Sequence, residues 1–284
     1  MYKEYDKEEL KRVQNAQKEI LKSFDLFCKE HDLKYFLTFG TLLGAIRHKG
    51  FIPWDDDIDV GMLREDYDKF IELAKDGFGD KYEVLTPLLN KNYCSSVTHV
   101  QNKKTTFVSE GAKDLKCHLG INIDIFVYDN IPDDKELFKK QCLRTIFYGR
   151  LLYLRGSGNP EINLPLYLKI PASIICKLVH YGLIVTGMSS VRIYNNLLKH
   201  SKKYNSSSHK QITCFEDATP DKNVLSYDDL YPLQEIEFED ITAKIPNNAI
   251  KILINAYGED YMELPPLEKR VNHAPIIVKF EDEN

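Results

Sequence analysis

Four aspartates within five residues constrain this chain more than any other feature. They occupy positions 55–57 and 59, and the apolar Val60 follows at once. If the segment from Asp57 onward is extended, Asp57 and Asp59 share one face while Ile58 and Val60 point into a core. Two carboxylates on one face repel each other and persist only where something offsets the repulsion. The run therefore predicts a strand edge that binds a hard divalent cation, Mg²⁺ or Mn²⁺, through oxygen ligands.

A second segment places another acid on a strand. Residues 120–128 alternate, so that one face carries Ile121, Ile123 and Ile125 and the other carries Asn122, Asp124 and Phe126. A buried carboxylate is costly unless it is paired or bound to a metal. Asp124 is thus a candidate third metal ligand beside Asp57 and Asp59. The alternative is a strand-end aspartate that accepts hydrogen bonds from backbone amides.

A turn at Gly40-Thr41 precedes the aspartates. Its backbone N–H groups can approach a phosphate closely, although Gly40 could simply turn the chain and Thr41 cap the next helix. Arg47 and His48 are nearby cations suited to phosphate contact. We expect some of the cations in this segment to be simply solvated. Carboxylates, a metal and a phosphate-binding turn together predict a phosphoryl-transfer site, in which one aspartate can accept the proton of the attacking hydroxyl.

The whole chain has the composition of a folded globular protein. It has 284 residues, of which 43% are hydrophobic. Residues 1–10 are charged and show no apolar leader, so we expect a cytoplasmic protein. The six cysteines are scattered without a CxxC pair, which argues against a zinc site and a disulfide framework and fits a reducing compartment.

Charge is unevenly distributed along the chain. Residues 135–210 hold 13 Lys or Arg against two acids, a net charge of +11, while the remainder carries −16. Such asymmetry favours an anionic partner (nucleic acid, anionic lipid or a phosphate-bearing polymer), unless these are simply solvated basic helices. The apolar stretch 164–185 contains Lys169, Pro171, Lys177 and His180, so we expect no membrane span. Aromatic residues among cations, such as Phe147 and Arg150, leave open a helix lying on a membrane surface.

Hydrophobic periodicity predicts an α/β (α+β) fold with a mixed β-sheet flanked by helices. The predicted helices are residues 6–31, 41–47, 64–77, 133–155, 163–204 and 247–257. The predicted strands are residues 34–39, 82–86, 96–100, 105–108 and 120–128. We expect a core unit over 1–132, a basic helical subdomain over 133–205, and a segment over 206–284 that completes the core.

Several motifs together resemble the LicD family of phosphocholine transferases, which is related to the fukutin-type sugar-modifying enzymes. The resemblance is carried by FGTLLGAIR at 39–47, IPWDDDIDV at 52–60, IDIF at 123–126, YGEDYM at 257–262, LPP at 264–266, Arg270 and His273. It extends from about residue 20 to 275 and is weakest over 135–210. It implies a nucleotidyltransferase-fold core with a basic helical insertion.

The resemblance also implies an activity: metal-dependent transfer of phosphocholine from CDP-choline to a sugar hydroxyl of a cell-surface glycan. The glycan would be a teichoic acid, capsule or lipo-oligosaccharide, in some cases lipid-linked. By the same resemblance, Asp57, Asp59 and Asp124 would hold the metal, and Gly40 and Thr41 would form the phosphate-binding turn. Arg270 and His273 would contact the donor phosphates.

Alternatives to this activity remain. CDP-ribitol or CDP-glycerol could be the donor, or the chain could be a nucleotidyltransferase acting on a small hydroxyl compound. Thr41, in place of the usual Ser or Gly, and a long gap from the turn to the aspartates disfavour nucleotide addition. A polymer-binding protein without turnover is a third reading, but binding alone does not need repelling carboxylates. We expect no nucleic acid partner and a peripheral contact of residues 135–210 with the inner face of the cytoplasmic membrane.

Overall fold

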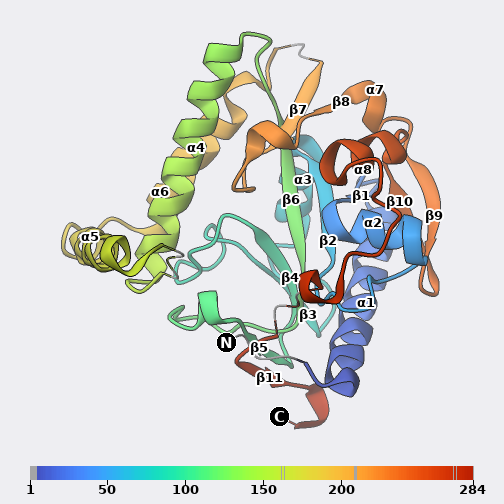
Figure 1. Cartoon of the computed structure of the whole chain (residues 1–284), viewed down its shortest axis with the longest axis horizontal. Helices are drawn as coiled ribbons and strands as arrows, with labels where there is room; N and C mark the ends of the chain where they lie inside the picture. The colour runs from blue at the N-terminus through green and yellow to red at the C-terminus, as the bar shows by residue number, and fades with distance from the viewer. Residues whose placement is uncertain are drawn as a thin grey trace.

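A mixed β-sheet forms the centre of the molecule in a computed structural model that describes residues 5–160, 162, 164–207, 210–270, 272 and 274–283 (Figure 1). Seven strands belong to this sheet: β1 (Phe36–Leu37), β2 (Asp59–Leu63), β6 (Asn122–Asn130), β4 (Thr98–Asn102), β3 (Tyr82–Leu85), β7 (Gln211–Cys214) and β8 (Leu225–Ser226). The order is β1-β2-β6-β4-β3, with β7 paired to β6 and β8. The mixed sheet flanked by helices confirms the predicted fold class.

The parallel pair β2–β6 lies at the middle of the sheet, and the other pairings in it are antiparallel. The predicted alternation is confirmed on both strands. Ile58, Val60, Ile123 and Ile125 are completely buried in the main core. The acidic side chains that alternate with them therefore lie on the opposite face.

Three helices from the first third of the chain accompany the sheet: α1 (Lys7–Glu30), α2 (Phe39–His48) and α3 (Arg64–Leu73). α1 packs its apolar face into the main core, and the Asp6 side chain caps it by accepting a hydrogen bond from the Glu8 N–H at 2.8 Å.

The start of α2 differs from the sequence prediction. The helix begins at Phe39 and not at Thr41, and Thr38 is its N-cap residue. The preceding strand is correspondingly short, and Phe39 has a positive φ of 46°. Thr41 therefore lies inside the first turn and is not the helix cap. Its hydroxyl is used elsewhere, as described below.

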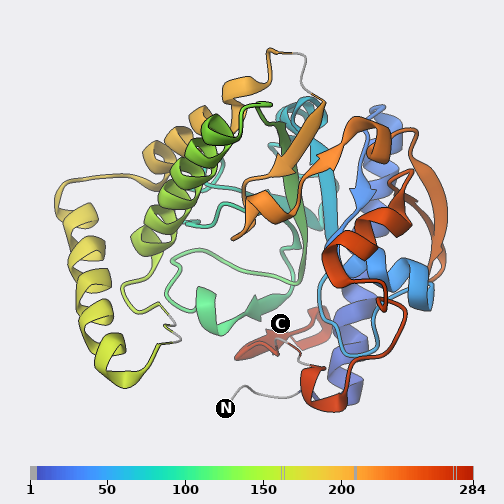
Figure 2. The same ribbon diagram turned by 45° about the horizontal axis from the view of Figure 1, so that its top comes forward.

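The basic region forms α4 (Lys135–Gly156), α5 (Leu166–Val185) and α6 (Ser190–Ser201), and β7 then rejoins the sheet. Figures 1 and 2 show α4 and α6 beside the sheet and α5 on their outer side.

The remaining elements of the C-terminal part are α7 (Tyr227–Leu230), β9 (Gln234–Phe238), β10 (Ile241–Ile245), α8 (Ala249–Tyr257) and β11 (Ile277–Lys279). β11 pairs with β5 (Thr106–Val108), so the predicted strand 105–108 exists but lies outside the main sheet. Among the described residues there are also five short 3₁₀ turns: Glu110–Ala112, Lys202–Tyr204, Pro220–Lys222, Leu267–Lys269 and Glu281–Glu283.

A buried ion pair fastens α3 to the central strand. Arg64, the first residue of α3, donates from Nε and Nη2 to the two carboxylate oxygens of Asp129 on β6, at 2.9 and 2.6 Å. Both side chains are almost fully buried. Asn205 also donates to Asp129, so the end of the helical region joins the same cluster. Because α3 follows β2 directly, this contact holds β2 and β6 in register.

Replacing Arg64 by Met should destabilise the fold strongly. The substitution leaves Asp129 buried without its cation, which typically costs about 3–5 kcal/mol. Urea denaturation monitored by circular dichroism measures the change. The control is Lys75→Met, which removes an exposed pair with Glu72 and should cost under about 1 kcal/mol. Equal losses for the two variants would contradict this role of Arg64.

Candidate functional site

A cleft of 210 Å³ opens beside the carboxyl-bearing face of β6. Its lining includes Asp57, Asp124, His99, Asn122 and Gln17. These residues come from the loop before β2, from β4, from β6 and from α1. The cleft therefore gathers polar side chains from four separate parts of the chain.

Two of the predicted carboxylates are direct neighbours in the sheet. Asp59 is the first residue of β2, and in the parallel register its partner on β6 is Asp124. Adjacent strands are about 4.8 Å apart, so the two side chains leave the sheet close to each other. The Asp124 N–H also donates to the Ile58 carbonyl at 2.8 Å, next to Asp57. The structure thus brings all three predicted carboxylates to one end of the β2–β6 pair.

Burial raises the pKa of each of these carboxyl groups, and repulsion from neighbouring carboxylates adds to the effect at Asp57 and Asp59. Burial, followed by the charges of Asp124 and Asp56, raises the pKa of Asp57 to about 7. Burial raises the pKa of Asp124 to about 7 as well. The pKa of Asp59 lies well above its usual range because of burial and the charges of Asp57 and Asp124. No lysine or arginine in the described part of the chain forms an ion pair with any of the three.

Asn122 and His99 are the polar neighbours of Asp124. Asn122 donates from Nδ2 to Asp124 at 2.6 Å, and His99 Nε2 lies 3.3 Å from the same oxygen. Burial lowers the pKa of His99 to about 4, so its ring is neutral at physiological pH. These contacts orient Asp124 without neutralising it. His99 was not predicted, since a lone histidine in the β4 sequence carries no signal of its own.

The carboxylate oxygens at this site suit a hard divalent cation. Such ions prefer oxygen ligands, and among the residues that the structure describes no positive charge neutralises these carboxylates. Within the described ranges, however, no group of three or more His, Cys, Asp or Glu side chains is already arranged to hold a metal ion. The chemistry of the site therefore fits a metal, whereas a closed ligand shell is not formed by the protein alone. Metal binding by Asp57, Asp59 and Asp124 stays a prediction.

The predicted phosphate-binding turn is the first turn of α2. Gly40 and Thr41 are among its first residues, whose N–H groups have no partner within the helix and favour anions. The Thr41 hydroxyl accepts a hydrogen bond from the Asp59 N–H at 2.8 Å, which ties this turn to β2. A Cβ atom at Gly40 would lie 3.1 Å from an oxygen of Asp55. The turn is therefore next to the aspartates, as the sequence suggested.

Arg47 and His48 contact the C-terminal segment in this structure. Arg47 donates from Nη1 to the carbonyls of Tyr261 and Glu263, at 2.9 and 3.2 Å, and from Nε to His48 Nε2 at 2.9 Å. Partial burial lowers the pKa of both side chains. Arg47 thus anchors the 261–263 segment, and contact of either residue with phosphate stays a prediction.

Arg270 brings the C-terminal motif to the aspartate loop. Its guanidinium lies 4.8 Å from the ring centroid of Trp54, a cation–π distance, and its Nε donates to the Pro265 carbonyl at 2.8 Å. This position is compatible with the predicted donor-phosphate contact. The other predicted contact, His273, lies outside the described residues.

Asp56 and Tyr257 are further residues of the site. Asp56 is 4% exposed and accepts a hydrogen bond from the Tyr5 hydroxyl at 2.8 Å, while Gln17 donates to its backbone carbonyl. Asp56 therefore fixes the aspartate run onto α1. Tyr257, at the end of α8, lies near the cluster: burial and the charges of Asp59 and Asp55 raise its pKa to about 12. Only its position in the C-terminal motif could have indicated Tyr257.

Comparisons with known proteins agree with this geometry. The model of the family described as LicD/FKTN/FKRP, nucleotidyltransferase domain, matches residues 32–141. The chain is 27% identical to lipopolysaccharide cholinephosphotransferase LicD of Haemophilus influenzae over 263 residues, covering 89% of this chain and 91% of that protein. It is 32% identical to an uncharacterized protein of Rickettsia prowazekii over 111 residues, 36% of this chain and 41% of that protein. Ribitol 5-phosphate transferase FKRP of Homo sapiens is 53% identical over 34 residues, 12% of this chain and 7% of that protein.

The matched region contains the chemical centre of the site. Residues 32–141 include the first turn of α2, the aspartate run and Asp124. The similarity to the Haemophilus influenzae protein extends over nearly all of the chain, beyond the family domain. Residues 32–141 of this chain therefore carry the nucleotidyltransferase domain of the LicD family.

Proposed function

We propose that this protein is a phospho-alcohol transferase that moves phosphocholine from CDP-choline to a sugar hydroxyl of a cell-surface glycan. The observation that carries the proposal is the similarity to a cholinephosphotransferase across 89% of the chain. The clustered carboxylates beside a phosphate-suited helix terminus support it. The glycan would be a teichoic acid, a capsule or a lipo-oligosaccharide, free or lipid-linked.

In the proposed reaction, a sugar hydroxyl attacks the phosphorus that bears choline, the bond to the CMP oxygen breaks, and CMP leaves. The α2 first-turn N–H groups would bind phosphate oxygens, and Arg270 would contact the phosphate of the leaving CMP. Asp57 or Asp124, whose pKa values lie near 7, would accept the proton of the attacking hydroxyl. A divalent cation held by Asp57, Asp59 and Asp124 would supply charge neutralisation for the phosphates.

A second donor has specific support. Over the 34 matched residues, identity to the human ribitol 5-phosphate transferase reaches 53%. CDP-ribitol and CDP-glycerol share the CDP half with CDP-choline, so the same cleft could accept them.

The donor is identified by incubating the protein with Mg²⁺ and CDP-choline, CDP-ribitol or CDP-glycerol, and measuring CMP release by chromatography. We expect CMP release to be fastest with CDP-choline and to increase when a glycan acceptor is added. A preference for CDP-ribitol would change the proposed donor and leave the proposed class of reaction unchanged. Transfer of CMP to the acceptor with release of the phospho-alcohol would overturn the proposal.

Asp59→Asn and Asp124→Asn should each lower CMP release by at least about a hundredfold, the scale expected when a group that stabilises transition-state charge is lost. Each substitution keeps the side-chain shape and removes the charge. Asp76→Asn, at an exposed position, is the matched control and should retain full activity. Thermal unfolding verifies that all three variants fold. Undiminished activity of both site variants would exclude this carboxylate site.

The metal-free protein should lose stability as pH rises from about 4 to about 7. In that range the folded carboxyl groups of Asp57 and Asp124, with pKa values near 7, keep protons that the unfolded chain releases, so the free energy of unfolding falls with pH. Urea unfolding at several pH values measures this slope, and Asp124→Asn should flatten it. Mg²⁺ should raise the melting temperature more at pH 8 than at pH 5. An identical slope in the variant, or an equal Mg²⁺ effect at both pH values, would contradict this explanation.

A further inference from the structure

α5 exposes an unusual amount of apolar surface. Nine of its large apolar side chains are at least 44% exposed: Tyr167, Leu168, Ile170, Ile174, Ile175, Leu178, Tyr181, Ile184 and Val185. At 3.6 residues per turn, they cover an arc of about 200° around the helix. By length and composition the stretch Tyr167–Val185 could cross a membrane, yet only 6% of it is buried in the protein. Exposed apolar patches of this kind mark interaction surfaces.

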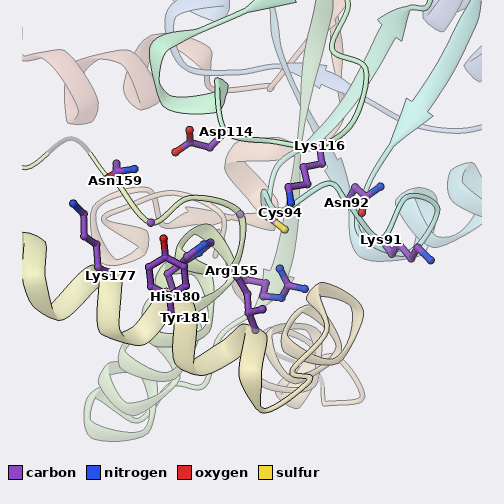
Figure 3. A pocket seen from close by; sticks show the side chains of 13 residues that line it. Lys91, Asn92, Cys94, Asp114, Lys116, Arg155, Asn159, Lys177, His180 and Tyr181 are labelled. Atoms are coloured by element: carbon purple, nitrogen blue, oxygen red, sulfur yellow. The ribbon is translucent and has the colours of Figure 1, made fainter.

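One edge of this apolar face of α5 borders a pocket of 510 Å³, because Tyr181 and Ile184 line that pocket as well. Its walls are the end of α4, the turn at 156–159, α5, and the loops that carry residues 91–94 and 114–116. Figure 3 shows Lys177, His180 and Tyr181 extending from α5 towards these loops. The pocket and the apolar face therefore adjoin each other on one helix.

The pocket carries a net positive charge that its own residues leave largely uncompensated. Lys91, Lys116, Arg155 and Lys177 line it, against the single carboxylate of Asp114. In the described part of the chain none of the four cations forms an ion pair. Arg155 is held in place by its Nε, which donates to the Met188 carbonyl at 2.9 Å. Asp114 accepts a hydrogen bond from the Ser157 hydroxyl.

This combination selects the kind of partner. A phosphate group suits the pocket because lysine and arginine donate charge-assisted hydrogen bonds to it. The adjacent apolar arc needs a hydrophobic environment. A nucleic acid would leave the arc uncovered, and a second copy of the chain would bring two strongly basic segments together. A lipid, with an anionic head group and apolar chains, meets both requirements.

Charge also decides how α5 would meet the lipid. Lys169 and Lys177 lie within the helix, and a charged side chain at the centre of a bilayer is costly. A helix that lies in the interface keeps such lysines at head-group level while its apolar face enters the acyl region. Tyr167 and Tyr181, near the two ends, have the amphipathic character favoured in that zone.

We propose that α5 lies in the surface of an anionic membrane and that the pocket behind it binds the phosphate of a lipid head group. The proposal does not depend on the reaction at the carboxylate cleft. One segment of the chain contributes to both cavities, since Ser109 and Ala112 line the cleft and Asp114 and Lys116 line the pocket. The bound membrane would therefore lie beside the cleft.

Vesicle flotation with the whole protein tests the apolar face. We expect binding to vesicles of phosphatidylcholine mixed with phosphatidylglycerol, little binding to phosphatidylcholine alone, and a decrease as NaCl rises. Ile175→Glu combined with Leu178→Glu should abolish binding. The control combines Leu26→Glu and Leu73→Glu, two exposed leucines on α1 and α3, and should bind as the unaltered protein does.

A second pair of variants tests the pocket. Lys116→Glu combined with Lys177→Glu should weaken vesicle binding by about tenfold or more. Lys69→Glu combined with Lys103→Glu changes the net charge equally at exposed positions outside the pocket and should have a much smaller effect. Equal weakening by the two pairs would show general electrostatic attraction and overturn the pocket assignment. CMP release with a soluble acceptor should be unchanged in all these variants, which separates this proposal from the proposed reaction.

Three other outcomes would overturn the membrane proposal. In the first, inorganic phosphate protects Lys116 and Lys177 from chemical acetylation while vesicles do not bind, so that the ligand is a soluble phosphate. In the second, vesicles do not bind and Ile175→Glu with Leu178→Glu converts a dimer to a monomer, so that a second copy covers α5. In the third, the protein stays in the membrane after an alkaline carbonate wash, which would indicate a span.

Discussion

The parallel pairing of β2 and β6 is the constraint on which the site depends. It sets Asp59 beside Asp124, while Val60 and Ile125 lie beneath them in the core. A shift of one residue in this register would turn the carboxylates inward and the apolar side chains outward. Two contacts outside the pair prevent such a shift: the Asp59 N–H bonded to the Thr41 hydroxyl, and the buried Arg64–Asp129 pair at the other end of the strands. The same core that stabilises the sheet therefore positions the carboxylates of the candidate site.

Repulsion at the site is maintained by the surrounding fold. Asp57, Asp59 and Asp124 all have raised pKa values because burial disfavours their charged forms, and neighbouring carboxylates raise the pKa of Asp57 and Asp59 further. The fold could relieve this with a lysine, yet within the described residues the only ion-pair partner is His99, which burial keeps neutral. Uncompensated carboxylates of this kind cluster at functional sites, where a ligand restores the balance. Under the proposed function, binding of a cation would relieve this repulsion.

Local sequence pattern predicted the strands that carry the site, because alternation at 57–60 and 120–128 directly reports which side chains are buried. It could not find His99 or Tyr257, since these reach the cluster only through the pairing of β4 and the packing of α8. The early start of α2 was missed because the positive φ of Phe39 is set by tertiary context. α5 shows most clearly what the sequence pattern cannot predict. Its apolar composition fits a buried helix, and only the three-dimensional arrangement shows that its surface is exposed. Periodicity describes one helix face, whereas exposure depends on what the rest of the chain covers.

The two cavities differ in the charge of their lining, and residues of the 109–116 segment contribute to both. The carboxylate cleft repels phosphate until a cation is bound, whereas the pocket behind α5 attracts it through four cationic side chains. A phosphate-bearing lipid would therefore enter the pocket rather than the cleft in the absence of a divalent cation. With a cation bound, the cleft would become attractive to a nucleotide-linked donor as well. Membrane attachment and donor binding would then respond to different conditions, because salt screens the exposed lysines more than it screens the buried aspartates.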